Sequence, residues 1–478
     1  MVSHTAAQTK STRQKNQGTN YVKFKQGRMP VMNRPVVATY HLLILVDNSM
    51  YPESMARPLW SLLLVAMVLV LSVTPGFAQA GRLDPTFGQG GKVVTNIPGP
   101  MTAIARAVAL QSDGKIVVAG GLGAGQEIGL VRYNTNGALD GSFGRSGIAL
   151  ANIPNNILSS ASGVAIQVDG KILAGGTVYT LSGANAFIGM GVVRFNTNGS
   201  MDSSFGTAGV VTALPFQASR CGGAPVALQP DGKILLAGGC NKGTGANSTS
   251  FSTILRFDSN GSLDSAFGTG GAAVLAEIPS AIALQSDGKI VVAGGGTVSR
   301  YNTNGSIDSS FGIFGSVGSI GTSAAVAVQS DGKILVAGTF SDQLSVTPDG
   351  DFALIRYNSD GTVDQGFGMH GGALADFFTG TSSAAAVAIA VESNSDIVVA
   401  GKASQGTNPS QFAVARFTSL GDLDPTFGAG GVVKTSFGQT DSVAAIALQA
   451  DGKIVAAGNS VNVTTGNDAF ALARYIAP

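Results

Sequence analysis

The sequence predicts an all-β protein, a seven-bladed β-propeller of four-stranded antiparallel blades. Three observations predict it. A stretch of the kind AVALQSDGKIVVAG recurs seven times, each copy follows an LDxxFG element and precedes an Arg-aromatic pair, and short runs rich in Val, Ile and Ala are bounded by Gly, Asn and Asp. Four-stranded units repeated around a ring are the pattern of a propeller, and a fixed repeat outweighs any local interpretation of the chain.

The first unit shows how four strands arise from the repeat. We expect strands at residues 92–95, 106–111, 115–120 and 129–133. The Asp113-Gly114 pair between two apolar runs favours a tight hairpin turn, because glycine accepts the positive φ that such a turn requires. The nearly continuous apolar runs indicate strands buried on both faces, as when one blade stacks on the next.

The two ends of the repeat region predict a closed ring. An open solenoid is the alternative, but solenoids usually carry atypical capping repeats, and neither end has one. The repeats begin with the strand that follows LDxxFG and end with the strand that precedes it. We therefore expect residues 92–95 to complete the last blade beside residues 470–475, which removes two open sheet edges.

An aspartate recurs in every LDxxFG element. We expect it to cap backbone N–H groups of its own turn and to pair with the repeated Arg, because a partly buried guanidinium needs a carboxylate. The Phe of the element is expected to pack between blades. Residues present in every blade favour a structural role, since a single active site breaks the symmetry. The seven aspartates are Asp84, Asp140, Asp202, Asp264, Asp308, Asp364 and Asp424.

Calcium is the one metal that the repeats suggest. Asn134, Asn136 and Asp140 resemble the second half of a calcium loop, and the pattern recurs in later units. Calcium takes about six to eight oxygens and usually several carboxylates. These loops lack the first acidic position, and an Asn-Gly turn explains them without metal. No cofactor is therefore predicted, and calcium stays as an alternative.

The chain before the repeats divides into two segments. Residues 1–54 are basic at their start and are expected to be a mis-assigned or disordered extension. Residues 55–80 have the charged start, the apolar run at 59–73 and the Ala78-Gln79-Ala80 cleavage site of a signal peptide, which leaves residues 81–478 as an exported propeller, either secreted, periplasmic or extracellular. A membrane anchor at 59–73 is the alternative, although a spanning helix needs about 20 residues.

Composition excludes several classes of function. Removing residues 1–80 removes eight of 29 Lys and Arg and two of 28 Asp and Glu, which leaves a net charge of about −5. The mature chain has no basic stripe that would predict nucleic-acid binding, and it has no long apolar run that would predict a membrane span. His370 is the single histidine after residue 80, so a site with several histidine ligands is excluded and a Ser-His-Asp triad would have to use this residue.

The two cysteines are expected to form a disulfide. Cys221 and Cys240 flank the third Asp-Gly hairpin and should lie near each other at its open end. Export implies an oxidising compartment, in which disulfides persist. Two free thiols are the alternative.

The loops fall into two sets, one on each face of the ring. The Asp-Gly-Lys turns and the Asn-Gly connections are uniform, whereas the loops near residues 96–104, 121–127, 177–186, 241–249, 339–351 and 403–411 vary. Binding residues concentrate on variable loops that a rigid scaffold holds. We therefore expect a ligand on the variable face, around the channel mouth. The candidate contacts are Arg106, Arg220, Lys242 and Lys402.

The repeat resembles the bacterial delta-60 repeat proteins. The matching stretches are LDPTFGQGGKVVT (Leu83–Thr95), AVALQSDGKIVVAG (Ala107–Gly120) and VRYNTNGALDGSFG (Val131–Gly144). The resemblance implies a propeller-like fold and an exported protein of unknown function, and it supplies no catalytic residues. The sixth unit departs from the pattern, with Asn394-Ser395-Asp396 in place of Asp-Gly-Lys and Leu420-Gly421 in place of Asn-Gly.

Taken together, the sequence favours a non-catalytic module that binds, or serves as a scaffold for, an extracellular or envelope protein or glycan. The alternative is a carboxylate-dependent hydrolase or lyase at the channel mouth. An enzyme needs polar residues that break the repeat, whereas the expected innermost strands, such as residues 107–110 and 444–448, are apolar and monotonous.

Overall fold

A computed structural model describes residues 80–97, 103–122, 127–155, 158–182, 185–243, 248–341, 350–378, 382–462 and 467–477. Residues 1–54, and the proposed signal peptide up to residue 79, lie outside these ranges, so their predictions stay predictions. Within the described part of the chain, no helix is long and apolar enough to cross a membrane.

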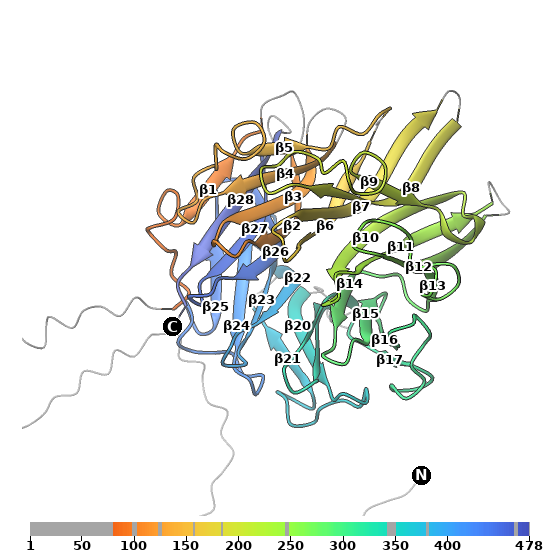
Figure 1. Cartoon of the computed structure of the whole chain (residues 1–478). Helices are drawn as coiled ribbons and strands as arrows, with labels where there is room; N and C mark the ends of the chain where they lie inside the picture. The colour runs from red at the N-terminus through yellow and green to blue at the C-terminus, as the bar shows by residue number, and fades with distance from the viewer. Residues whose placement is uncertain are drawn as a thin grey trace, which may run out of the picture. The chain divides into compact units, whose positions relative to one another are not determined.

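Seven four-stranded antiparallel blades make up the fold, so the predicted seven-bladed propeller is confirmed (Figure 1). A short 3-10 helix, η2 (Pro215–Gln217), lies before β10. The strands are β1 (Lys92–Thr95), β2 (Ile104–Leu110), β3 (Ile116–Leu122), β4 (Glu127–Tyr133), β5 (Ile148–Leu150), β6 (Ser160–Ile166), β7 (Ile172–Ser182), β8 (Asn185–Phe195), β9 (Val210–Ala213), β10 (Arg220–Leu228), β11 (Ile234–Lys242), β12 (Thr249–Phe257), β13 (Ala272–Leu275), β14 (Ala281–Leu284), β15 (Ile290–Gly294), β16 (Thr297–Tyr301), β17 (Ser316–Gly318), β18 (Thr322–Val328), β19 (Ile334–Ser341), β20 (Gly350–Tyr357), β21 (Gly372–Ala375), β22 (Ser382–Val391), β23 (Ile397–Gln405), β24 (Gln411–Phe417), β25 (Val432–Thr435), β26 (Thr440–Leu448), β27 (Ile454–Asn462) and β28 (Asn467–Tyr475).

In blades 1 to 6 the strand order follows the chain from the centre of the ring to its rim, whereas the outer strand of blade 7 is β1. We number the blades 1 (β2–β5), 2 (β6–β9), 3 (β10–β13), 4 (β14–β17), 5 (β18–β21), 6 (β22–β25) and 7 (β26–β28 with β1). The first strands of neighbouring blades contact one another all the way round, from β2 and β6 to β26 and β2 (Figure 1). A single bridge, Gly350↔Ser383, also joins blades 5 and 6.

The first strand of the described residues pairs with the last. β1 runs antiparallel to β28, with Lys92 opposite Ala473 and Thr95 opposite Phe470. Gly81 N donates to Ile476 O, and Ile476 N donates to Arg82 O, both at 2.8 Å. In blade 1 the same two bonds lie within one continuous Asn-Gly turn, between Gly137 and Asn134 and between Asn134 and Ala138. Residues 80–95 therefore supply the turn and the outer strand of blade 7, which in every other blade follow directly in the sequence.

The core is divided among the interfaces between blades. Each of the seven described hydrophobic clusters contains residues of two neighbouring blades, and one of them joins Leu472 of blade 7 to Val118 of blade 1. The Phe of each LDxxFG element is fully buried. Phe87 lies against Gly137 of the next blade, where a Cβ atom would approach the ring to 2.9 Å and where φ is +87°. Glycine is required there for both reasons.

The disulfide prediction is confirmed, and one loop prediction is wrong. Cys221 and Cys240 are bonded, and they stand directly opposite each other on β10 and β11. The segment expected to be a variable loop at residues 177–186 is mostly strand, because β7 continues to Ser182 and β8 begins at Asn185. Thr177, Val178 and Tyr179 continue the β-favouring pattern, so the hairpin extends beyond the repeat.

We predict that ring closure depends on the N-terminal segment. Deleting residues 82–96 from a chain that begins at Ala80 should lower the melting temperature sharply, because blade 7 loses its outer strand and its Asp84. A synthetic peptide spanning these residues should raise the melting temperature again, whereas a scrambled peptide should not. A melting temperature that the deletion leaves unchanged would contradict closure.

We predict that the disulfide forms in the exported protein and stabilises blade 3. The two cysteines are 19 residues apart, and closing a loop of this length stabilises a fold by about 3 kcal/mol through the unfolded chain. A Cys221→Ser/Cys240→Ser variant should unfold at correspondingly lower denaturant. Mass spectrometry after alkylation without reductant gives the direct check, since modification of both cysteines would contradict the bond.

Candidate functional site

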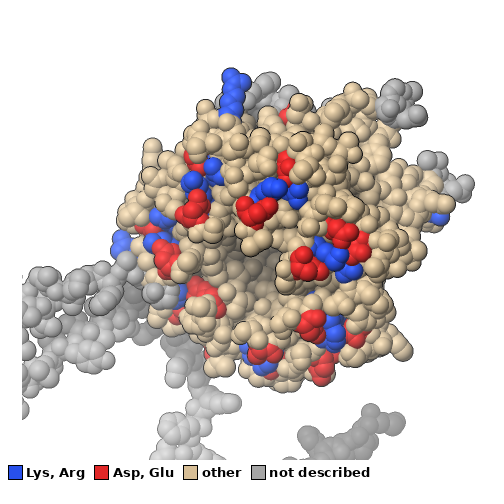
Figure 2. Space-filling view, in the orientation of Figure 1, with Lys and Arg blue, Asp and Glu red and all other residues tan. Residues whose placement is uncertain are grey.

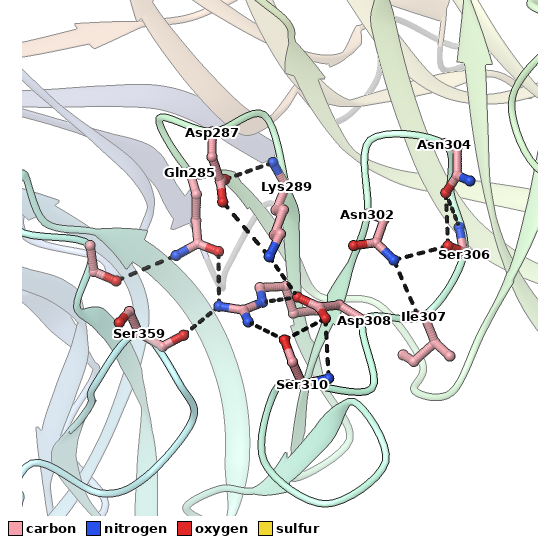
Figure 3. Close-up of polar contacts among 12 residues, drawn as sticks. Gln285, Asp287, Lys289, Asn302, Asn304, Ser306, Ile307, Asp308, Ser310 and Ser359 are labelled. Carbon is pink, nitrogen blue, oxygen red and sulfur yellow. Dashed lines mark hydrogen bonds and ion pairs between the residues drawn. The ribbon is translucent and has the colours of Figure 1, made fainter.

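An Arg–Asp–Lys cluster occupies the turn end of nearly every blade, and blade 4 shows its geometry (Figure 3). Arg300 Nε donates to Asp308 Oδ2 at 2.7 Å, and Lys289 Nζ lies 3.0 Å from the same oxygen. Asp308 Oδ1 accepts from Ser310 N at 3.1 Å and from Ser310 Oγ at 2.7 Å. Both carboxylate oxygens are therefore occupied, and the turn after β16 is fixed to the strand before it.

The same guanidinium also joins two blades. Arg300 Nη1 donates to the carbonyl of Ser359, which belongs to the Asn-Gly type turn of blade 5 (Figure 3). Its Cζ lies 4.8 Å from the centre of the Phe311 ring. Arginine presents several donors in a rigid plane and stacks on aromatic rings, so one side chain serves the carboxylate, the neighbouring blade and the phenylalanine.

The cluster is repeated around the ring. Seven Arg-Phe pairs have Cζ-to-ring distances between 4.3 and 4.9 Å. In six blades the Lys Nζ lies 2.9 to 3.8 Å from the Asp Oδ2. In the same six blades Arg Nη1 donates to a carbonyl of the next blade. The sixth blade is the exception in both respects.

The electrostatics of the cluster favour the charged forms. Burial alone would raise the pKa of Asp140, but hydrogen bonds from Ser142 and ion pairs with Arg132 and Lys115 lower it to about 2. The pKa of Asp308 is lowered in the same way by Ser310, Lys289 and Arg300. The carboxylates therefore stay ionised at any ordinary pH, which suits a structural ion pair rather than a proton-transfer group.

The same contacts argue against calcium binding at these turns. Asn136 Oδ1 accepts from Ala138 N at 3.0 Å, as in an Asn-Gly turn, and Asp140 already accepts from Ser142, Arg132 and Lys115. A calcium ion at this position would have to displace two cations from Asp140. Among the described residues, no group of three or more His, Cys, Asp and Glu side chains is placed to hold a metal.

Charged side chains gather in separate clusters around a central hollow on the uniform face (Figure 2). Cavities lie between neighbouring Asp-Gly turns there. One of 750 Å³ lies between blades 7 and 1, beside Gln449 and Gln111, and one of 540 Å³ between blades 2 and 3, beside Gln167 and Gln229. The uniform face thus carries concave sites that the sequence prediction had not assigned to it.

The four predicted ligand contacts are exposed but are not brought together. Arg106 is the extra residue of a β-bulge in β2, in blade 1. Arg220 and Lys242 lie in blade 3, at the start of β10 and the end of β11. Lys402 lies in β23 of blade 6. None of the four makes an ion pair with a described residue, and residues 98–102, 123–126 and 244–247 beside them lie outside the description.

Lys402 is a charged residue at a strand position where two other blades have a hydrogen-bond acceptor. It stands where blade 2 has Thr177 and blade 7 has Asn459, as the register of the two inner strands shows. Thr177 Oγ1 accepts from Gly223 N at 3.1 Å, and Asn459 Oδ1 accepts from Ala105 N at 2.7 Å, so both hold the next blade. Lys402 is exposed in this place and has a side chain without an acceptor, so it cannot hold the next blade in this way.

One buried acidic cluster was missed by the sequence reasoning. Glu277 lies between blades 3 and 4 and is 5% exposed. Ser299 Oγ donates to Glu277 Oε2 at 2.5 Å and lies 2.8 Å from Ser316 Oγ, while Tyr301 Oη lies 3.5 Å from both carboxyl oxygens. Burial raises the pKa of Glu277 to about 7, against the opposing effect of the bonds from Ser299 and Tyr301.

Alignment of the repeats contains a signal for this cluster. The strand register places Glu277 where other blades have Ile97, Ile153, Pro215, Phe377 and Phe437. Ser299 likewise replaces an apolar residue, such as Val131 in blade 1. Ser316, which pairs with Ser299, stands where blade 1 has Ile148. Three polar residues that replace apolar ones at adjacent positions indicate a compensated exchange. His370, the other repeat-breaking group, is exposed in a turn at φ +54°.

We predict that the Arg–Asp–Lys cluster stabilises the fold. Asp308→Asn should lower the free energy of unfolding by about 3 kcal/mol, because it leaves Arg300 buried without its carboxylate. Asp287→Asn is the matched control, since Asp287 is in the same blade but its side chain is 55% exposed, and it should cost less than about 0.5 kcal/mol. Denaturant unfolding compares the two, and equal effects would contradict the assignment.

We predict a pH dependence from Glu277. Its pKa is about 7 in the folded state and near 4.5 when exposed, so the contribution of this group is fully present below pH 4.5 and is lost as the pH rises to 7. The loss should amount to about 3 kcal/mol. Glu277→Gln should remove this part of the pH dependence, whereas Glu127→Gln, at a partly exposed position in blade 1, should retain it. The same slope in both variants would contradict the role of Glu277.

Comparison with solved structures yields distant matches. A protein of unknown function from Bacteroides caccae is 15% identical, with 67% of this chain and 98% of that chain covered, at a TM-score of 0.35. An aldose sugar dehydrogenase from Streptomyces coelicolor is 12% identical, with coverages of 65% and 92% and a TM-score of 0.37. The α-L-arabinofuranosidase Arb93A from Fusarium graminearum is 10% identical, with coverages of 80% and 98% and a TM-score of 0.41. Matches this distant assign no activity.

Comparison with curated proteins finds no significant match. The family comparison finds a match in each of the seven repeats. The family is described as a domain of unknown function (DUF5122) β-propeller, and the matched residues are 111–143, 167–205, 229–267, 285–311, 329–367, 393–427 and 449–475. Because these segments amount to half of the chain and follow the blades one by one, the protein belongs to the DUF5122 β-propeller family.

Proposed function

We propose that the protein is an exported, non-catalytic binding or scaffold module for an extracellular or envelope protein or glycan. The observation that carries the proposal is the contrast between the two kinds of charged residue. The repeated Arg, Asp and Lys are engaged with one another, whereas Arg106, Arg220, Lys242 and Lys402 are exposed, differ from blade to blade and have no ion-pair partner among the described residues.

Export is part of this proposal. The Cys221–Cys240 disulfide supports it, because such bonds persist in oxidising compartments. The Met55 to Ala80 segment supports it as a signal peptide. We also infer that the repeat is of the delta-60 kind, on the strength of its LDxxFG and Asp-Gly-Lys elements.

The binding surface in this proposal is the variable face near the channel mouth. Arg106 lies on an innermost strand, at a bulge, and bulges commonly re-aim a side chain next to a functional site. Arg220 begins another innermost strand two blades away. Cations spread over several blades suit an extended anionic or polar surface, such as an acidic protein or an acidic glycan, better than a small substrate.

A hydrolase or lyase is the second candidate, and Glu277 is the observation that favours it. A carboxyl with a pKa near 7 has the property of a general acid or base. The group is buried, however, and its neighbours Ser299, Ser316 and Tyr301 satisfy it from within the fold. It therefore fits a packing role better than a catalytic one.

An array of extracellular glycans and envelope proteins tests the binding proposal. We expect the protein that begins at Gly81 to retain an anionic ligand, and Arg106→Glu, Arg220→Glu and Lys402→Glu to weaken the retention by about tenfold each. Arg145→Glu is the control, because Arg145 is an exposed cation in a turn of the uniform face. Equal retention by all variants would exclude the variable face, and turnover of a glycan by wild type but not by Glu277→Gln would favour the enzyme.

A further inference from the structure

Blade 6 lacks the cation that completes the Arg–Asp–Lys cluster elsewhere. The lysine of the Asp-Gly-Lys turn is replaced by Asp396. The glutamine that precedes the turn in the other six blades is replaced by Glu392; those glutamines are Gln111, Gln167, Gln229, Gln285, Gln329 and Gln449. Two neutral or positive positions have thus become acidic in one blade.

The replacement leaves a buried carboxyl oxygen unsatisfied. The Glu392 side chain is 9% exposed, and its Oε1 has no hydrogen-bond partner in the described part of the chain. The nearest cation is Arg416, whose Nη1 lies 3.9 Å from the other oxygen, Oε2. Arg416 donates to Asp424 through Nε at 2.7 Å, and its own Nη1 has no hydrogen-bond partner among the described residues. A buried charged group without partners is costly, so this oxygen calls for a donor.

A cavity of 650 Å³ opens beside this carboxyl, between blades 6 and 7. Glu392, Ser393 and Asn394 form one wall, and Gln449, Ala450 and Asp451 form the other. Corresponding cavities at three other interfaces have cations in their walls, namely Lys453 and Arg474, Arg194, and Lys233 with Arg256. The cavity between blades 6 and 7 is lined by two acidic residues and by no Lys or Arg.

We propose that this cavity binds a primary ammonium group, which takes the place that lysine occupies in the other six blades. In those six blades a Lys Nζ lies 2.9 to 3.8 Å from Oδ2 of the LDxxFG aspartate, whose counterpart in blade 6 is Asp424, and the position of Glu392 is held by an uncharged glutamine. An ammonium from outside donates to Glu392 Oε1 and offsets the surplus of carboxylates around Arg416. The ligand is a lysine side chain of a partner protein, or a free amine of the same chemistry.

Charges around the cavity support a cation over an anion. Burial raises the pKa of Glu392, Arg416 opposes this, and Asp396 and Asp424 add to it. A bound ammonium therefore favours the ionised carboxyl and lowers its pKa. On the opposite wall Asp451 is neutralised by Lys453 at 2.5 Å, so Glu392 is the group that selects the ligand.

Calorimetric titration with N-acetyl-lysine methylamide tests the proposal. We expect saturable binding to wild type and binding about tenfold weaker or absent in Glu392→Gln, which carries the residue of the other six blades and should therefore fold. Asp396→Lys should also abolish binding, because it restores an internal lysine, and it should raise the melting temperature. The norleucine analogue of the probe, which lacks the ammonium, should not bind to any variant.

The controls separate this site from the variable face. Gln329→Glu places the same carboxyl in blade 5, where Lys333 is retained, and should not create a second site. Arg220→Glu, which removes a contact of the variable face, should leave the titration unchanged. The test of this cavity is therefore independent of whether the variable face binds a ligand. Butylamine distinguishes the source of the ammonium, since binding of the lysine amide alone assigns the site to a protein partner. No binding by wild type, or equal binding by Glu392→Gln, would overturn the proposal.

Discussion

The fold depends on a guanidinium that bonds to its own blade and to the next one. Arg132 shows the arrangement, with Nε on Asp140 at 2.8 Å and Nη1 on the Thr197 carbonyl of blade 2 at 2.6 Å. Lysine could not replace it, because a single ammonium does not offer donors in two fixed directions. Each blade is a small sheet with a thin core, so the interfaces, rather than the blades, hold most of the buried apolar residues. The repeated polar contact ties six of the seven blades to the next one.

Much of this could be predicted from the sequence, because each blade repeats the same physical solution. The Asp-Gly turns, the apolar strands and the opposed cysteines are local features with known geometry. The segment at residues 177–186 was wrongly expected to be a loop because Thr177 to Leu181 lies outside the repeat and its pairing with β8 depends on the partner strand. Local patterns do not show how far a hairpin extends.

The acidic sites could not be predicted in the same way. Glu277 is an ordinary loop residue in the sequence, and its buried carboxyl accepts a hydrogen bond from Ser299, a residue of the neighbouring blade. Glu392 differs from the glutamine of the other blades only in having a carboxyl in place of an amide. Its proposed role in binding depends on Arg416 and on the cavity beside it. Both sites arise where one blade departs from the others, so comparison between blades finds them where motif searches do not. The repeat provides the scaffold, and its exceptions provide the candidates for function.

Hydrogen exchange of the first strand tests the central claim, which is that residues 80–95 complete blade 7. Peptides covering residues 83–95 should exchange as slowly as those covering the equivalent residues 139–150 of blade 1, because both sets of amides bond to the strand before them. Exchange of residues 83–95 at the rate of an unfolded chain, with residues 139–150 protected, would show that the ring is open at this point and would contradict the account.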